Sequence, residues 1–259
     1  MYPVDLTGKV AAIFGVANHR SLAWGVAQAL DKAGARLLFT YQGDRLKDKV
    51  AALAGKCEGS LLAPCDVTDQ ASVDNVFKLL DDECGRLDML VHSVAYAPRE
   101  ELEGEFLHTT RDGYRTTMEI SAYSLVNLAA GAVPLMEKAG GGSIITMSFM
   151  AAERVVPRYN VMGSAKAALE HGSRQLAYEL GPKNIRVNSL SAGPVNTLAA
   201  RGISRVSEML VHHREKACLK RSITLEDVGG SALFLLSDLS SGVTGETLHV
   251  DAGYTIMGM

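Results

Sequence analysis

The sequence has few residues that could cross-link the chain or form a metal cluster. Its four cysteines are Cys57, Cys65, Cys84 and Cys218, and they form no C-x-x-C pair and no finger-like spacing. This pattern favours free thiols in a reducing compartment. We therefore expect neither a disulfide framework nor a metal site.

The sequence also lacks a strong charge of one sign and a long apolar run. A net charge of −3 over 259 residues argues against a protein that binds nucleic acid by neutralising phosphates. No stretch of about eighteen consecutive apolar residues occurs. The segment MYPVDLTGKV has no basic region followed by an apolar run, so no signal peptide is expected. These absences predict a soluble, cytoplasmic protein without a nucleic-acid or membrane partner.

What the sequence does contain is a regular alternation of strand and helix patterns. Short β-rich apolar runs lie at 9–15, 36–41, 61–65, 87–95, 142–149, 185–191 and 247–251. Helical patterns lie between them at 21–34, 44–55, 70–84, 113–137, 159–180 and 225–238. Continuous apolar strands indicate burial on both faces. The pattern predicts one α/β domain over residues 1–259, Rossmann-like and doubly wound, with a seven-stranded, mostly parallel sheet and helices on both faces.

The first strand of this sheet leads into a candidate phosphate loop. In such folds the ligand binds beyond the carboxyl ends of the strands. Within GVANHRSLAWG, Gly15 would allow a tight turn, Ser21 is a good N-cap for the next helix, and Gly25 would let that helix approach the sheet. Only two glycines of the G-x-G-x-x-G pattern remain. Its position after the first strand is therefore the main argument for a nucleotide.

The next two strands favour NADH over NADPH. Gln42 stands where a ribose-binding carboxylate is usual, and its amide can hydrogen-bond a ribose hydroxyl. No Arg or Lys at 40–43 could bind a 2′-phosphate. Asp66, after the third strand, has two open interpretations: it accepts a hydrogen bond from adenine, or it begins the next turn. For His92, core packing is the favoured interpretation.

Tyr159 and Lys166 form a candidate reactive pair. Seven helical residues make nearly two turns and rise about 10 Å, so both side chains share one face. The tyrosine could donate a hydrogen bond to a carbonyl oxygen that gains negative charge. The lysine cation could help it release a proton and could bind ribose hydroxyls. Spacing alone favours two surface residues, whereas their place after the fifth strand, at the edge that carries the phosphate loop, favours an active site.

Together these motifs resemble a known superfamily. The nucleotide loop, a Tyr before a Lys after the fifth strand, and SAGPV at 191–195 are similar to short-chain dehydrogenases/reductases. Most members have the lysine four residues after the tyrosine, where this chain has Gly163. The longer spacing, with ERVVPRYNVMGSAK, SAGPVNTLAARGI and VHSVAYAP, resembles bacterial NADH-dependent enoyl-acyl-carrier-protein reductases over essentially the whole chain.

The resemblance implies a role for each matching position. Tyr159 would stabilise the enolate formed when hydride reaches the β-carbon of an enoyl thioester, and Lys166 would hold the nicotinamide ribose. The implied NADH-binding residues are Gly15, Ser21, Leu22, Gln42, Asp66, Val67, Val94, Lys166, Val195, Asn196, Thr197, Leu198 and Ala199. The implied acyl-binding residues are Ala97, Phe149, Tyr159, Met162, Ala199 and Ile203. It also implies a substrate-binding flap near 196–221, acyl carrier protein as the partner that carries the substrate, and a homotetramer.

Three positions depart from the family pattern. Phe149 stands where most bacterial members have a second tyrosine, and in this it is similar to the mycobacterial branch. Ala95 replaces a glycine, and Cys218 replaces a proline. A phenyl ring cannot hydrogen-bond the substrate, so no catalytic hydroxyl is expected at 149.

Two other functions stay open beside NADH-dependent reduction of the trans-2 double bond of enoyl thioesters in type II fatty-acid synthesis. A 3-ketoacyl reductase would have the shorter Tyr–Lys spacing and an upstream serine, for which Ser148 is available. An NAD-sensing protein without turnover could lose the Tyr or the Lys, yet this chain has both.

Overall fold

A computed structural model of the chain describes residues 4–197 and 206–258. Within them, seven strands pair into one sheet of order β3-β2-β1-β4-β5-β6-β7, and every pair is parallel. The strands are β1 (Val10–Phe14), β2 (Arg36–Tyr41), β3 (Leu61–Pro64), β4 (Met89–His92), β5 (Gly142–Ser148), β6 (Ile185–Ala192) and β7 (Thr247–Val250). The predicted Rossmann-like, doubly wound sheet is confirmed.

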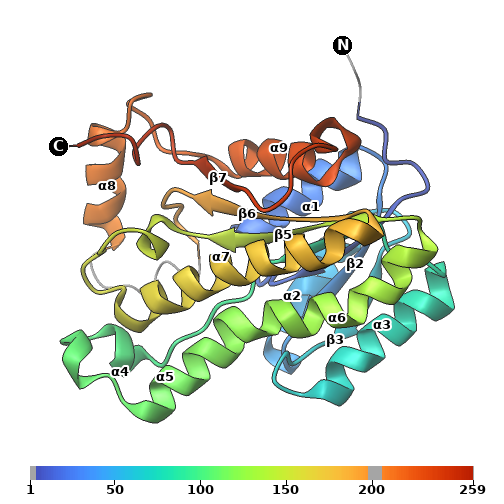
Figure 1. Ribbon diagram of the computed structural model, residues 1–259, viewed down its shortest axis with the longest axis horizontal. Helices are drawn as coiled ribbons and strands as arrows, with labels where there is room; N and C mark the ends of the chain where they lie inside the picture. Colours follow the sequence, from blue (N-terminus) through green and yellow to red (C-terminus); the bar gives the residue numbers. More distant parts are fainter. Residues whose placement is uncertain (1–3, 198–205, 259) are drawn as a thin grey trace.

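Helices cover both faces of the sheet (Figure 1). On one face an apolar cluster joins the strands to α1 (Leu22–Lys32), α2 (Asp44–Ala54) and α9 (Leu225–Leu236). On the other face a second cluster joins them to α3 (Gln70–Cys84), α6 (Ser124–Lys138) and α7 (Asn160–Leu180). Strand β1, which lies between β2 and β4, is buried at all five positions, and this explains its uninterrupted apolar sequence. No helix of the described residues is long and apolar enough to cross a membrane.

Gly25 has a different structural role from the one expected. A Cβ atom added at Gly25 would lie 2.7 Å from the carbonyl oxygen of Leu225, and one added at Gly229 would lie 2.5 Å from the carbonyl oxygen of Gly25. The two glycines therefore allow close packing of α1 on α9. The expectation that Gly25 brings its helix onto the sheet was wrong, because sequence spacing does not reveal a second helix that packs on the first.

The predicted helix at 113–137 is interrupted in the structure. It consists of α5 (Arg111–Met118), a π-helical turn (Glu119–Tyr123) and α6. A π turn adds a residue to one helical turn and is frequent at functional sites. Two α-helices of the described residues were not predicted: α4 (Arg99–Leu102), and α8 (Val206–Lys216) within the segment expected to be the flap.

Candidate active site

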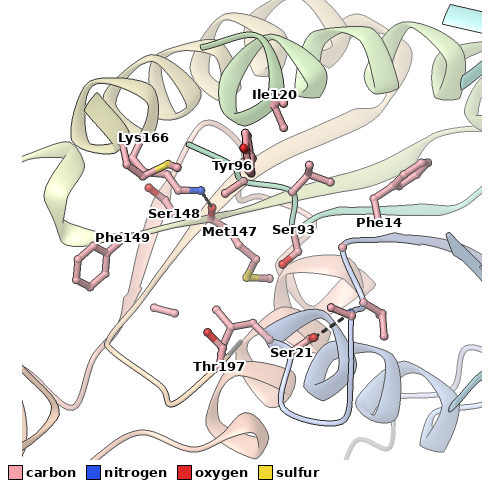
Figure 2. A pocket seen from close by; sticks show the side chains of 18 of the residues that line it. Phe14, Ser21, Ser93, Tyr96, Ile120, Met147, Ser148, Phe149, Lys166 and Thr197 are labelled. Carbon is pink, nitrogen blue, oxygen red and sulfur yellow. Dashed lines mark hydrogen bonds between the residues drawn. The ribbon is translucent and has the colours of Figure 1, made fainter. Parts of the chain in front are cut away.

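A cavity of about 690 Å³ lies at the carboxyl edge of the sheet, lined by residues of the loops that follow β1 to β6 and by the first turns of α7 (Figure 2). Most of the predicted site residues meet there: Gly15, Ser21, Leu22, Gln42, Asp66, Val67, Val94, Ala97, Phe149, Tyr159, Met162, Lys166, Val195 and Thr197. Asn196 is not among the residues that line the cavity. The predicted positions Leu198, Ala199 and Ile203 lie outside the described residues.

The loop after β1 is compact because of two residues. Gly15 has φ 105°, and a Cβ atom there would lie only 2.0 Å from the carbonyl oxygen of Ser93. The hydroxyl of Ser21 accepts hydrogen bonds from the N–H groups of Ala17 at 3.0 Å and Asn18 at 3.2 Å. Ser21 occupies the N-cap position of α1 but caps none of its N–H groups. Its side chain shapes the loop, and the predicted capping bond was wrong.

Gln42 and Asp66 come together at one end of the cavity. The Gln42 amide donates to Asp66 Oδ2 at 3.1 Å. Asp66 Oδ1 accepts from the N–H of Thr68 at 2.9 Å and from its hydroxyl at 2.7 Å, and these bonds lower the pKa of Asp66. Asp66 therefore forms the turn that begins the next helix and also lines the cavity. The two interpretations of this residue are compatible.

Tyr159 stands at the N-cap of α7, between two residues with left-handed backbone conformations. Arg158 has φ 65° and Asn160 has φ 39°, which are uncommon for residues other than glycine and are found at functional sites. The Tyr159 ring packs on Phe149 with 5.0 Å between centroids and 48° between ring planes. Burial raises the pKa of Tyr159, so its hydroxyl is protonated at neutral pH and can donate a hydrogen bond.

Lys166 is buried and bonded to the backbone of β5. Its side chain is 5% exposed, and its ammonium group donates to the carbonyl oxygen of Met147 at 2.7 Å, as Figure 2 shows. Burial lowers the pKa of Lys166 to about 8, and Glu170 opposes this shift. The pKa of Tyr159 is raised by burial, so the expectation that Lys166 eases proton release from Tyr159 stays a prediction.

His92 lies in the core, as expected. It is fully buried, with Nδ1 2.8 Å from the hydroxyl of Thr146 and Nε2 2.8 Å from the hydroxyl of Ser124. Burial, with a contribution from the charge of Lys166, lowers its pKa to about 3. The imidazole is therefore neutral and links β4 to β5 and α6.

The sequence did not reveal several residues of the cavity wall. Tyr96 and Ile120 both line it, and Met209 reaches it from α8. Tyr96 follows the fourth strand and could have been found there by position. Ile120 could not, because the π turn that carries it has no sequence signature.

The fold and the cavity define a class of protein. An open parallel sheet with a glycine turn after β1 and polar side chains at the carboxyl edge is the arrangement that binds dinucleotides. A half-buried tyrosine and a buried lysine in the same cavity add the groups that stabilise a developing oxyanion. The class is a dinucleotide-dependent reductase.

Comparison with known proteins narrows this class to one family. The family model described as Enoyl-(Acyl carrier protein) reductase matches residues 15–255. The chain is 50% identical over 254 residues to enoyl-(acyl-carrier-protein) reductase (NADH) 1 of Rhizobium meliloti, covering 98% of this chain and 93% of that protein. It is 48% identical to the Nostoc reductase of the same name, covering 99% and 100%. The chain belongs to the enoyl-(acyl carrier protein) reductase family.

Solved structures agree with this assignment. The Anaplasma phagocytophilum reductase in complex with NAD superposes with a TM-score of 0.94 at 50% identity, covering 98% of this chain and 96% of that one. The Bacillus cereus reductase with NADP+ and an indole naphthyridinone gives a TM-score of 0.96 at 46% identity, covering 98% and 100%.

Proposed function

We propose that the protein is an NADH-dependent enoyl-acyl-carrier-protein reductase that reduces the trans-2 double bond of enoyl thioesters in type II fatty-acid synthesis. The main observation behind this proposal is a single cavity. The protonated hydroxyl of Tyr159 and the ammonium of Lys166 line it, and so does Gly15 of the loop after β1. The family and the names of the relatives support the same reaction.

The residues of the cavity fit a dinucleotide. At Gly15 a Cβ would collide with the backbone of Ser93, so only glycine allows this close packing of the loop after β1. The loop leads to the N-terminus of α1, and a helix N-terminus is a favourable place for a pyrophosphate. Gln42 and Asp66 offer an amide and a carboxylate to ribose and adenine. No basic side chain stands at 40–43, which supports NADH rather than NADPH. When bound, NADH supplies the hydride that attacks the β-carbon.

The chain's own residues orient the substrate and stabilise its charge. The Tyr159 hydroxyl donates to the thioester carbonyl oxygen and holds it more tightly as it becomes an enolate. Lys166 would donate to ribose hydroxyls and would keep a positive charge in the same cavity. Phe149 and Met162 give the acyl group an apolar wall, with Ala97, Ala199 and Ile203 proposed to extend it.

The proposed assembly is one reductase domain over residues 1–259 with a flap near 196–221. Acyl carrier protein would deliver the substrate past this flap, with Asn196, Thr197, Leu198 and Ala199 on the cofactor side. A homotetramer in the cytoplasm is proposed from the family resemblance.

The 3-ketoacyl alternative is less well supported. It needs a free serine hydroxyl beside the tyrosine, but the hydroxyl of Ser148 donates to Glu170. Lys166 also stands one turn further along α7 than that chemistry uses.

One assay separates the three functions. The purified protein is mixed with a trans-2-enoyl thioester or with a 3-ketoacyl thioester, and oxidation of NADH and of NADPH is followed. Turnover of the enoyl substrate with NADH is expected, with Tyr159→Phe slower by about a hundredfold at unchanged NADH affinity. Turnover of the keto substrate alone would favour the carbonyl reductase. NADH binding without any turnover would favour the sensing protein.

A further inference from the structure

A buried carboxylate lies one helical turn beyond Lys166. Glu170 is 4% exposed, Lys166 5% and Ser148 5%, so the three polar side chains are enclosed together. Because residues i and i+4 share a face of a helix, Lys166 and Glu170 lie one above the other on α7. A fully enclosed Glu without an ion-pair partner is rare, since burial of a charge is costly unless it is bonded.

Neighbouring residues of β5 bind the two charged side chains. The carbonyl oxygen of Met147 accepts from the Lys166 ammonium at 2.7 Å, and the hydroxyl of Ser148 donates to Glu170 Oε1. Figure 2 shows Met147 and Ser148 beside Lys166 at the cavity. The end of β5 therefore fixes both the cation and the carboxylate, and it does so with groups that carry no net charge.

Glu170 is the acidic group that acts on the charge of Lys166. Glu170 works to raise the pKa of Lys166, whereas the imidazole of His92 on β4 is neutral, with a pKa of about 3. Burial raises the pKa of Glu170, and its hydrogen bond from Ser148 opposes this rise. The charge of Glu153 after β5 adds to the rise, whereas those of Arg174 on α7 and His249 on β7 reduce it. His249 Nε2 lies 3.3 Å from Glu153 Oε1, so those two groups can form a pair of their own.

We propose that Glu170, held by Ser148, is a positioning residue that keeps Lys166 protonated during the reaction. The proposal rests on the proposed function of Lys166. The charge of a buried lysine is hard to maintain because desolvation favours the neutral amine. A fixed carboxylate on the same helix face offsets this penalty without blocking the ammonium group, which stays free to donate to a ligand in the cavity. Glu170 is not among the residues that line the cavity, so its proposed effect is exerted through Lys166.

The titration of Lys166 tests the proposal without substrate. The full-length protein is labelled with ¹³C at the lysine ε-carbon, and the Lys166 signal is assigned as the one lost in Lys166→Arg. In Glu170→Gln, which keeps the size and the acceptor for Ser148, we expect the midpoint to fall by about one pH unit. The matched control is Glu179→Gln, at an exposed glutamate of the same helix, which should leave the midpoint unchanged.

The pH dependence of turnover gives a second readout. In Glu170→Gln, the alkaline limb of kcat/KM for the enoyl thioester should move to lower pH by the same amount as the NMR midpoint of Lys166. In Glu170→Asp, part of the wild-type position of this limb should be restored. If Glu170→Gln does not fold, Ser148→Ala is used, and a smaller shift in the same direction is expected. An unchanged Lys166 midpoint in these variants overturns the proposal. If the Lys166 midpoint shifts but the wild-type protein reduces no enoyl thioester, the proposed function is overturned. The effect of Glu170 on the protonation of Lys166 is then still supported.

Discussion

The ring of Phe149 lies 5.0 Å from the ring of Tyr159 and is tilted by 48° to it. Phe149 directly follows β5 and is 9% exposed, whereas Tyr159 is the N-cap of α7. The aromatic pair therefore joins a strand end to a helix start across the cavity wall. The contact orients the tyrosine by packing, with no hydrogen bond from position 149.

Shortening Phe149 should loosen Tyr159. Phe149→Ala removes a buried ring and is expected to lower the free energy of unfolding by about 3 kcal/mol, because large-to-small changes lose transfer energy and leave a cavity. The kcat for an enoyl thioester should fall about tenfold as the tyrosine leaves its productive orientation. Thermal unfolding and steady-state kinetics measure the two effects. Phe149→Tyr keeps the ring and should retain the stability; equal losses in both variants would contradict a packing role.

Gly15 should tolerate no side chain. Gly15→Ala combines φ 105° with a Cβ atom 2.0 Å from the carbonyl oxygen of Ser93, so the loop must move. We expect NADH affinity to fall at least about tenfold, measured by fluorescence titration. Gly8→Ala is the matched control, since Gly8 has φ 78° but nothing within 4 Å of the added atom. It should cost about 1 kcal/mol of stability and leave NADH affinity unchanged. Wild-type affinity in Gly15→Ala would mean that the loop is not the phosphate site.

The sequence predicted the fold well because strands that are buried on both faces of a sheet consist of continuous apolar residues. Uninterrupted apolar runs such as VAAIF at 10–14 and MLV at 89–91 identify strands that are buried along their length. The same logic located the loops after each strand, and through them most of the cavity. Tyr159 and Lys166 were predicted as site residues from their position after the fifth strand, because their spacing alone favoured two surface residues.

What the sequence could not predict depends on contacts between distant segments. Gly25 faces α9, which lies about two hundred residues away in the chain, so nothing near it in sequence indicates the partner. The direction of the Tyr159 pKa shift follows from burial by the surrounding elements, which a motif does not contain. The π turn at Glu119–Tyr123 likewise arises from packing, because the residues themselves fit an ordinary helix.

Cofactor affinity should depend on pH through Lys166. The pKa of this residue is lowered to about 8, so the charged form predominates below that pH and is lost as the pH rises through it. If Lys166 donates to the ribose, NADH affinity should be constant below about pH 7 and decrease above about pH 8. Lys166→Ala should bind NADH about tenfold more weakly and show no such limb. Fluorescence titrations with NADH over this pH range measure both the affinity and its pH dependence. If the affinity of Lys166→Ala still decreases above about pH 8, the titrating group is not Lys166.

The hydroxyl of Ser121 should control the substrate side of the cavity. It donates to the carbonyl oxygen of Tyr96 at 2.9 Å and accepts from the N–H of Tyr96 at 2.9 Å, so one π-turn residue fixes the backbone of a cavity-lining residue. Ser121→Ala breaks both bonds and leaves a part-buried N–H group unpaired, at a cost of about 1 kcal/mol. We expect the KM for the enoyl thioester to rise about fivefold while NADH affinity stays the same, because Tyr96 is next to Ala97 of the proposed acyl-binding residues and two residues beyond Val94 of the proposed NADH-binding residues. Ser231→Ala, which removes a hydroxyl bonded only within α9, is the control and should change neither value. A loss of NADH affinity in Ser121→Ala would show that the Tyr96 loop supports the cofactor as well.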